Sequence, residues 1–171
     1  PSVTSPGAQS ANTDPNTCAA SVTYAITVGG TPTPDLTYSM SGASNGSGAG
    51  SGSGYTFPKG ATAVTVTATN TCGSVATTFT VTVTDQQLPT ITCPSNVTIG
   101  HDAGQCYATN VALGSPGVND NCGSVTVSPY LGVNPVTLST VFPVGNHIVV
   151  WTATDGNGNM VYGLTDTGNL Y

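Results

Sequence analysis

The chain contains an internal duplication, which limits it to folds that use one small unit twice. Pro1–Cys18 aligns without gaps on Pro89–Cys106, and Tyr55–Asn70 aligns on Thr140–Asp155. A period of roughly 85 to 88 residues is too long for a solenoid repeat and suits a small autonomous domain. The sequence therefore predicts two similar domains in tandem, joined by a short connection.

Charged residues are few, and their types argue against helices. All seven acids are aspartates, and Lys59 is the only basic residue apart from two histidines. Helix surfaces are usually built from Glu, Lys and Arg, whereas Thr and Val favour strands and Gly, Asn and Pro favour turns. A chain without Glu or Arg that is rich in Thr, Val, Ser and Gly is therefore expected to be all-β.

The charge balance also excludes several partners. The net charge is -6 at pH 7, and the sequence has no basic cluster. Nucleic acids and anionic membrane surfaces bind through such clusters, so we expect neither partner. No stretch reaches the roughly 18 apolar residues that a membrane-spanning helix needs, so we also expect no membrane insertion.

Apolar and polar residues alternate in segments of strand length that are bounded by Gly, Pro and Asn turns. In the first copy, three such segments place these residues on one face each: Val22, Tyr24, Ile26 and Val28; Val64, Val66 and Ala68; Phe79, Val81 and Val83. In the second copy the apolar strand residues are Ile91, Val97, Ile99, Val111, Leu113, Val125, Val127 and Ile148–Trp151. Short strands at this spacing are typical of β-sandwiches. The predicted sandwich domains are residues 1–86 and 87–171.

A glycine-rich stretch, Ser41–Gly54, lies inside the first copy and has glycine at every even position from Gly46 onward. One interpretation is a mobile surface loop. The other is an extended strand with a bare glycine face, which another backbone or a glycan could approach closely.

Several motifs follow one another in a characteristic order: TFPKGATAVTVTATN in the first copy, and LPTITCPSNVTIGHDAGQC, VNDNCG and VFPVGNHIVVWTATDGNGN in the second. With these motifs the chain resembles the hyalin-repeat (HYR) family, whose modules are immunoglobulin-like β-sandwiches of secreted adhesive and cell-surface proteins. The resemblance covers nearly all of both copies and is strongest in Pro89–Asp155. It implies two tandem immunoglobulin-like domains, an extracellular or cell-surface location, and a structural or adhesive role without catalysis.

The resemblance also implies a disulfide pattern. Modules of this kind carry one bridge between the first and last strands and a second between the GxC position and the DNC turn. By this pattern we expect Cys106–Cys122 in the second copy and, for the first copy, Cys18–Cys72. Each bridge would stabilise its domain by roughly 2 to 4 kcal/mol, and both require an oxidising compartment.

Cys93 is the odd cysteine in this pattern, because Gly163 stands where its partner in the last strand would fall. In the first copy, Ser5 and a residue near Thr77 replace both members of that bridge. An odd cysteine in a secreted chain indicates a buried free thiol, a covalent link to another molecule, or an error in the assigned pairing.

The last strand of the second copy is degenerate. In the alignment, three apolar residues of the first copy, Phe79, Val81 and Val83, are replaced by Thr165, Thr167 and Asn169. Each lost apolar side chain forgoes about 1.5 to 3 kcal/mol of burial energy. Either the register shifts to bury Leu164, Leu170 and Tyr171, or another chain covers the gap.

An incomplete sandwich with an open edge suits donor-strand assembly, in which one subunit completes the sheet of the next. Repetition of that contact from head to tail gives an open filament. We therefore expect the terminal segments, residues 1–11 and 164–171, to join neighbouring copies of the chain. The candidate assembly residues are Pro1, Val3, Leu164, Leu170 and Tyr171.

No catalytic residues are indicated. His101 lies beside Asp102, but the first copy has Thr13 at that position, and His147 corresponds to Thr62. Two scattered histidines carry no triad signature, so we expect no enzymatic activity.

A calcium site is a weaker alternative in the second copy. Asp155, Asn157 and Asn159 offer oxygen ligands at alternate positions, as calcium loops do, and Asn119–Asn121 form a second cluster. The loop lacks the distal glutamate, and Asp, Gly and Asn are also good turn residues. We interpret the loop as a structural turn, with Ca2+ as the alternative and no other cofactor.

Covalent glycans are an expected partner. Asn45 and Asn96 begin N-glycosylation sequons, and Asn16 and Asn70 begin the rarer Asn-x-Cys form. A threonine-rich surface with few charges needs another source of solubility, which a glycan coat would supply.

Two functions agree with these features. The first is a non-catalytic structural subunit of an extracellular fibre, which polymerises with itself from head to tail and carries glycans. The alternative is a pair of spacer or adhesive repeats from a larger cell-surface adhesin.

Overall fold

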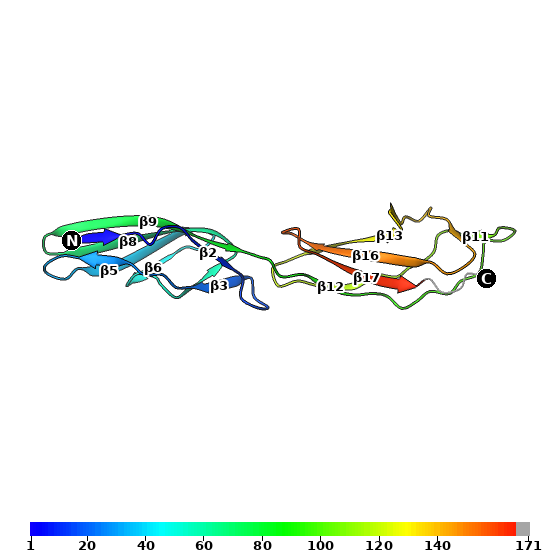
Figure 1. Cartoon of the computed structure of the whole chain (residues 1–171), viewed down its shortest axis with the longest axis horizontal. Helices are drawn as coiled ribbons and strands as arrows, with labels where there is room; N and C mark the ends of the chain where they lie inside the picture. The colour runs from blue at the N-terminus through cyan, green and yellow to red at the C-terminus, as the bar shows by residue number, and fades with distance from the viewer. Residues whose placement is uncertain (167–171) are drawn as a thin grey trace. The chain divides into compact units, whose positions relative to one another are not determined.

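The computed structural model describes residues 1–166, and in that range the chain contains strands, turns and loops but no helix (Figure 1). The predicted all-β class is therefore confirmed. The chain divides into two compact units, unit 1 from Pro1 to Gln86 and unit 2 from Gln87 to Tyr171. The division falls at the boundary that the duplication predicts. The described part of the chain holds no helix that is long and apolar enough to cross a membrane.

The larger sheet of unit 1 has the strand order β2-β9-β8-β5-β6. The bounds of these strands are Gln9–Asn12 (β2), Asp35–Gly42 (β5), Gly46–Ala49 (β6), Gly60–Asn70 (β8) and Gly73–Thr84 (β9). β2 runs parallel to β9, and the other pairs are antiparallel. The β8–β9 ladder extends from Gly60 opposite Val83 to Asn70 opposite Gly73.

Two short antiparallel ladders form the other layer of unit 1. Ser2–Thr4 (β1) pairs with Thr27–Gly29 (β4), and Ala19–Val22 (β3) pairs with Tyr55–Pro58 (β7). The single strand predicted over residues 21–28 is therefore wrong, because its two ends pair with different strands and the segment between them leaves the ladder.

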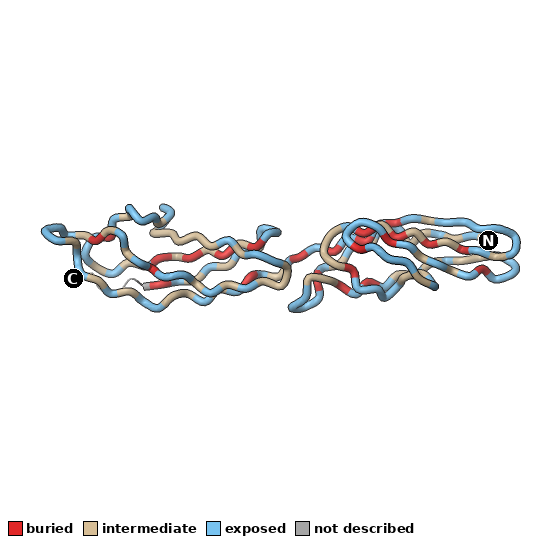
Figure 2. Tube along the Cα trace, turned by 180° about the vertical axis from the view of Figure 1, so that it is seen from behind, coloured by how far each residue is buried: buried red, intermediate tan, exposed pale blue. Residues whose placement is uncertain are grey.

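The core of unit 1 lies between these layers. Val64, Val66 and Phe79 of the larger sheet are buried against Ala20 and Phe57 of the smaller ladders. Buried positions, red in Figure 2, alternate with intermediate ones along β8 and with exposed ones along the second half of β9, as their Thr/Val alternation predicts. A sheet built on β9, β8 and β5 that faces β1, β3/β4 and β7 is the immunoglobulin-like arrangement.

Unit 2 repeats this plan with shorter ladders. Its larger sheet has the order β14-β13-β16-β17, and two further ladders pair β10 with β12 and β11 with β15. The bounds are Thr90–Thr92 (β10), Tyr107–Ala108 (β11), Gly117–Asn119 (β12), Val125–Leu131 (β13), Asn134–Pro135 (β14), Phe142–Pro143 (β15), Ile148–Asp155 (β16) and Met160–Asp166 (β17). Its core contains Ala108, Leu113, Phe142, Val149 and Trp151.

Part of the glycine-rich stretch is a strand, as the second interpretation proposed. Gly46–Ala49 forms β6 and pairs with β5, with Gly48 opposite Tyr38. A β-carbon on Gly48 would lie 2.8 Å from the Tyr38 ring, so the ring covers the glycine face. Glycine is required at position 48 because any larger residue would displace this tyrosine.

Candidate assembly surface

The final strand of unit 2 keeps the register of its counterpart in unit 1. Val149 pairs with Thr165, just as Val64 pairs with Phe79, so Thr165 occupies the position of Phe79 as predicted. Thr165 is fully buried, and the Trp151 indole Nε1 donates a hydrogen bond to its Oγ1 at 3.0 Å. The larger indole ring and this hydrogen bond take the place of the aromatic side chain found in unit 1.

Because the register does not shift, the residues that point outward from β17 stay in solvent. Met160, Tyr162 and Leu164 are 42, 64 and 64% exposed, and Ile148 of the neighbouring strand β16 is 56% exposed. We call these four residues the apolar face of β17. The alternative in which a register shift buries Leu164 is therefore wrong. The predictions for Thr167, Asn169, Leu170 and Tyr171 concern residues outside the described range.

The same face of unit 1 is polar or small. The paired residues Thr65–Thr78, Thr67–Ala76 and Thr69–Ser74 occupy the positions that Val150–Leu164, Thr152–Tyr162 and Thr154–Met160 occupy in unit 2. Two side chains of unit 1 even bond each other across the face, since the Thr65 and Thr78 hydroxyls are 2.9 Å apart. An outward apolar surface is thus a property of unit 2 that its own duplicate lacks.

β17 is also the last strand in its sheet. Within residues 1–166, no strand pairs with its outer edge. In unit 1 the end of β9 is covered by β2, which pairs with Val81–Thr84. An apolar edge strand exposes unpaired backbone groups beside its side chains and is a ready site for association.

The N-terminal segment is folded onto its own unit. β1 pairs with β4, β2 pairs with β9, and Val3 packs against the core of unit 1. Its backbone is therefore used within the chain, which corrects the expectation that residues 1–11, with Pro1 and Val3, extend to a neighbour. Of the assembly residues predicted from the sequence, Leu164 is the one that the described structure leaves on the surface.

The cysteine pairing differs from the expected one. Cys72, Cys93 and Cys106 are free thiols. Cys18 and Cys122 are in disulfide linkage. The predicted bridges Cys18–Cys72 and Cys106–Cys122 are therefore both wrong.

Each predicted bridge fails because its cysteines lie at opposite ends of one unit. In unit 1, the backbone N of Lys59 donates to the carbonyl of Cys18 before β8 begins, and Cys72 lies in the turn after β8 ends. A strand of 11 residues spans about 36 Å, whereas disulfide-bonded residues have Cα atoms within about 7 Å of each other.

In unit 2 the separation runs along β16. The carbonyl of Cys106 accepts from the backbone N of Val144, which precedes β16. The backbone N of Cys122 donates to Asp120, whose carboxylate lies near that of Asp155 at the other end of β16. The alignment identifies equivalent cysteines but does not show which end of the sandwich each occupies.

Cys93 faces Gly163 as predicted. Its Sγ occupies the space that a β-carbon on Gly163 would need. Cys93 is partly buried and packs against the core of unit 2 beside Ile91. Of the alternatives for this odd cysteine, the structure supports a free thiol in a partly buried position.

The loop after β16 is a turn built around Asp155. Asp155 Oδ1 accepts hydrogen bonds from the backbone N–H groups of Asn157 and Asn159, both at 2.8 Å, and Oδ2 accepts from Asn159 Nδ2 at 2.8 Å. Burial alone would raise the pKa of Asp155, but the hydrogen bonds from Asn159 and Asn157 outweigh it and hold the pKa below its usual value. These hydrogen bonds hold the loop in its turn conformation.

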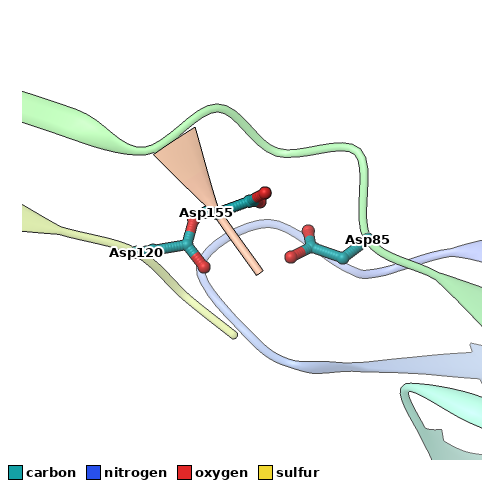
Figure 3. Close-up of side chains that lie close together, drawn as sticks. All are labelled: Asp85, Asp120 and Asp155. Carbon is teal, nitrogen blue, oxygen red and sulfur yellow. The ribbon is translucent and has the colours of Figure 1, made fainter. Parts of the chain in front are cut away.

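A second acid lies near Asp155 within unit 2. Carboxylate oxygens of Asp120 and Asp155 are within 4.8 Å of each other, as Figure 3 shows. In the described structure the buried Oδ1 of Asp120 accepts no hydrogen bond. Two adjacent carboxylates are the kind of ligand that Ca2+ takes from proteins. Asp85, also drawn in Figure 3, directly follows β9 in unit 1, where its Oδ1 accepts from Thr13 Oγ1.

The two histidines contact backbone carbonyls. The His101 Nδ1 is 2.9 Å from the carbonyl O of Asp102, and the His147 Nε2 is 2.7 Å from that of Pro143. The Asp102 carboxylate accepts from the backbone N and the hydroxyl of Thr109. Asp102 therefore fixes a turn and does not orient an imidazole for catalysis.

Three of the four sequon asparagines are exposed: Asn16, Asn45 and Asn96. Asn70 is partly buried, and its side-chain Nδ2 donates to the carbonyl of Pro32 at 2.7 Å. Its Oδ1 accepts from the backbone N of Cys72. The side-chain nitrogen and oxygen of Asn70 are therefore both hydrogen-bonded within unit 1.

The two all-β units have the topology of immunoglobulin-like domains. Residues 84–163 match the family model of the HYR domain. This match confirms, for residues 84–163, the resemblance to the HYR family seen in the motifs. The match indicates an adhesive, non-enzymatic module.

Several solved structures align with most of the chain at low identity. A chimeric titin Z1Z2-Z1Z2 tandem functionalized with a GRGDS peptide from fibronectin is 15% identical over 94% of this chain and 93% of that one, with a TM-score of 0.32. Drosophila N-cadherin EC1-4 is 13% identical over 93% of this chain and 46% of that one, with a TM-score of 0.37. The Bacteroides ovatus glucan-utilization protein SGBP-B, solved with a mixed-linkage heptasaccharide, is 12% identical over 94% and 43%, with a TM-score of 0.28.

Proposed function

We propose that the protein is a non-catalytic structural subunit of an extracellular fibre or surface assembly and polymerises from head to tail with copies of itself. The observation that carries this proposal is the apolar face of β17. Its residues Met160, Tyr162, Leu164 and Ile148 are 42 to 64% exposed on an edge strand and its neighbour. Grouped apolar side chains on a sheet edge mark an interaction surface, because burial against a second surface removes them from water.

A further copy of the chain is the occupant that fits this surface. The chain has few charges, with a single lysine and seven aspartates in total, so association needs little desolvation of ionic groups. A contact between different surfaces of identical subunits repeats without closing and gives a filament. The adhesive character of the HYR match supports the same role.

The proposed location is outside the cell. Disulfide linkage of Cys18 and Cys122 is stable in an oxidising compartment. We also propose glycans on the exposed asparagines Asn16, Asn45 and Asn96, where they would keep a weakly charged surface in solution. The intact mass of the protein from its natural source tests this, because a mass of 16.9 kDa would contradict modification.

The assembly proposal is tested by removing the apolar face. The double variant Tyr162→Thr/Leu164→Thr should reduce oligomer formation at least tenfold, measured by light scattering and negative-stain microscopy. Val133→Thr/Leu138→Thr is the matched control, because these residues are 90 and 78% exposed and lie outside the face. A wild-type chain that stays monomeric at high concentration, or equal effects of both variants, would contradict the proposal.

The HYR match also supports the second candidate, spacer or adhesive repeats of a larger adhesin. In that case the gene should encode many more repeats, and the isolated chain should remain monomeric with an intact apolar face. A short gene together with filaments of the purified chain would exclude it.

A further inference from the structure

Two exposed free thiols lie at the ends of their units that are remote from the connection at residues 86–87. Cys72 lies in the β8–β9 turn, and the chain leaves unit 1 at the other end of β9. Cys106 lies beside Val144, before β16 begins, whereas the chain enters unit 2 at Thr90, opposite Asn119. Both thiols are exposed, unlike that of Cys93.

Cys106 is the duplicate of a cysteine that is already in disulfide linkage. Before Cys18, the backbone N of Asp14 donates to Ala19 O at 2.7 Å, and the Asp14 carboxylate accepts from the backbone N of Ser21 at 3.0 Å. Before Cys106, Asp102 N donates to Tyr107 O at 2.8 Å, and the Asp102 carboxylate accepts from Thr109 N at 3.0 Å.

The backbone after each of these cysteines is also held in the same way. The carbonyl of Cys18 accepts from Lys59 N at 3.0 Å, and that of Cys106 accepts from Val144 N at 3.1 Å. The two cysteines are therefore held by turns with the same hydrogen bonds, but Cys18 is in a disulfide and Cys106 is a free thiol.

Cys72 occupies the place in unit 1 that the other bonded cysteine, Cys122, has in unit 2. Cys122 follows β12, in which Asn119 pairs with Thr90. The equivalent pair in unit 1 is Gly29 with Ser2, so the position of Asn121–Cys122 corresponds to Thr31–Pro32. Cys72 Sγ lies 3.8 Å from the carbonyl O of Thr31. A different element, the β8–β9 turn, thus brings a thiol to the same site.

We infer that Cys106 of one copy and Cys72 of the next copy form a disulfide that links chains covalently from head to tail. The pair of free thiols reproduces the local settings of the bonded pair Cys18 and Cys122, each at the end of its own unit that is remote from the connection. This inference rests on the proposed function, because it needs copies that meet end to end.

The chemistry requires a disulfide oxidant, such as a low-molecular-weight disulfide or a thiol–disulfide oxidoreductase. The thiolate of one cysteine attacks the oxidant's S–S bond and forms a mixed disulfide, which releases one thiol of the oxidant. The thiolate of the other cysteine then attacks the protein sulfur of the mixed disulfide, and the second oxidant thiol leaves. Two protein thiols are oxidised, and one oxidant disulfide is reduced to two thiols that carry both protons.

The test uses the full chain in a glutathione redox buffer, followed by non-reducing gels and mass spectrometry of linked peptides. Wild type should give a ladder of covalent oligomers, and the matched control Cys93→Ala should give the same ladder. Cys72→Ser and Cys106→Ser alone should give no species beyond a dimer. An equal mixture of the two, one of them tagged, should give the mixed dimer with a Cys72–Cys106 peptide as the main product.

Three results would overturn the inference: a ladder that persists in either serine variant, linked peptides that join like cysteines, or a Cys72–Cys106 bond confined to monomers. Light scattering in reducing buffer distinguishes a failure of the disulfide inference from a failure of the proposed function. Oligomers that form there without the crosslink leave the apolar face intact as the cause of assembly and remove only the disulfide. A crosslinked ladder without oligomers in reducing buffer would support the disulfide and contradict the role of the apolar face.

Discussion

The indole Nε1 of Trp151 donates a hydrogen bond of 3.0 Å to the hydroxyl of Thr165 in the core of unit 2. Both residues are buried, with Thr165 at 0% and Trp151 at 5% exposure. This bond explains how a strand that lost the phenylalanine of its duplicate still closes its sandwich. A buried indole N–H needs an acceptor, and the threonine provides one.

Thr165→Val should destabilise unit 2, because the substitution keeps the shape of the side chain and leaves the indole N–H without its acceptor. We expect a loss of about 1 to 3 kcal/mol in the free energy of unfolding. Trp151 is the only tryptophan, so urea titration followed by its fluorescence reports on unit 2. Thr165→Ser, which keeps the hydroxyl, should lose less. Equal losses in both variants would show that the methyl group matters and the hydrogen bond does not.

Gly163→Ala should be destabilising by about 1 to 3 kcal/mol, because the new β-carbon would overlap the Sγ of Cys93. Removal of that sulfur by Cys93→Ala should restore most of the loss in the double variant. A double-mutant cycle measured by urea unfolding gives the coupling between the two positions. Additive effects would contradict the contact between Cys93 and Gly163.

The stability of unit 2 should fall in acid through Asp155. Its pKa in the folded state is lowered by hydrogen bonds from Asn159 and Asn157 that outweigh the effect of burial, and the unfolded value is about 3.9. The unfolded state therefore binds the proton more readily, so the stabilisation is complete above about pH 5 and is lost as the pH falls through the folded pKa. Asp155→Asn should be less stable than wild type at pH 7 and should approach it near pH 2, measured by urea unfolding. A pH-independent difference would contradict this assignment.

We propose that Ca2+ binds beside the Asp120–Asp155 pair. Ca2+ would neutralise two adjacent carboxylates in the folded form. Millimolar Ca2+ should therefore stabilise unit 2 by on the order of 1 to 2 kcal/mol and raise its Tm by a few degrees. Asp120→Asn should abolish the shift and leave the Asp155 turn intact. Thermal unfolding followed by Trp151 fluorescence measures both. No shift in the wild type at 10-fold higher calcium would contradict the site.

The sequence predicts those features of the fold that depend on local periodicity. The alternation of threonine and valine in β8 and β9 indicates which side chains are buried, and the alignment of Thr77 with Gly163 indicates that Thr165 replaces Phe79. The position of Cys93 opposite Gly163 follows from the same alignment. Each of these is a property of neighbouring residues on one strand or of two aligned strands.

Features that depend on which end of a sandwich a residue reaches were not predictable in this way. Cys72 is separated from Cys18 by the length of β8, a distance that spacing in the sequence does not reveal. Asp120 and Asp155 approach each other because β12 and β16 end side by side, and no motif joins them. The division of the predicted strand into β3 and β4 likewise depends on two different pairing strands.

The parallel pairing of β2 with β9 has a mechanical consequence for unit 1. The four paired positions, from Gln9 opposite Val81 to Asn12 opposite Thr84, join β2, the second strand of the unit, to β9, its last strand. A pulling force on the two ends of unit 1 acts along these strands in opposite directions. The hydrogen bonds of the ladder are then sheared together and are not opened one after another. Unit 1 is therefore built to carry tension along the chain.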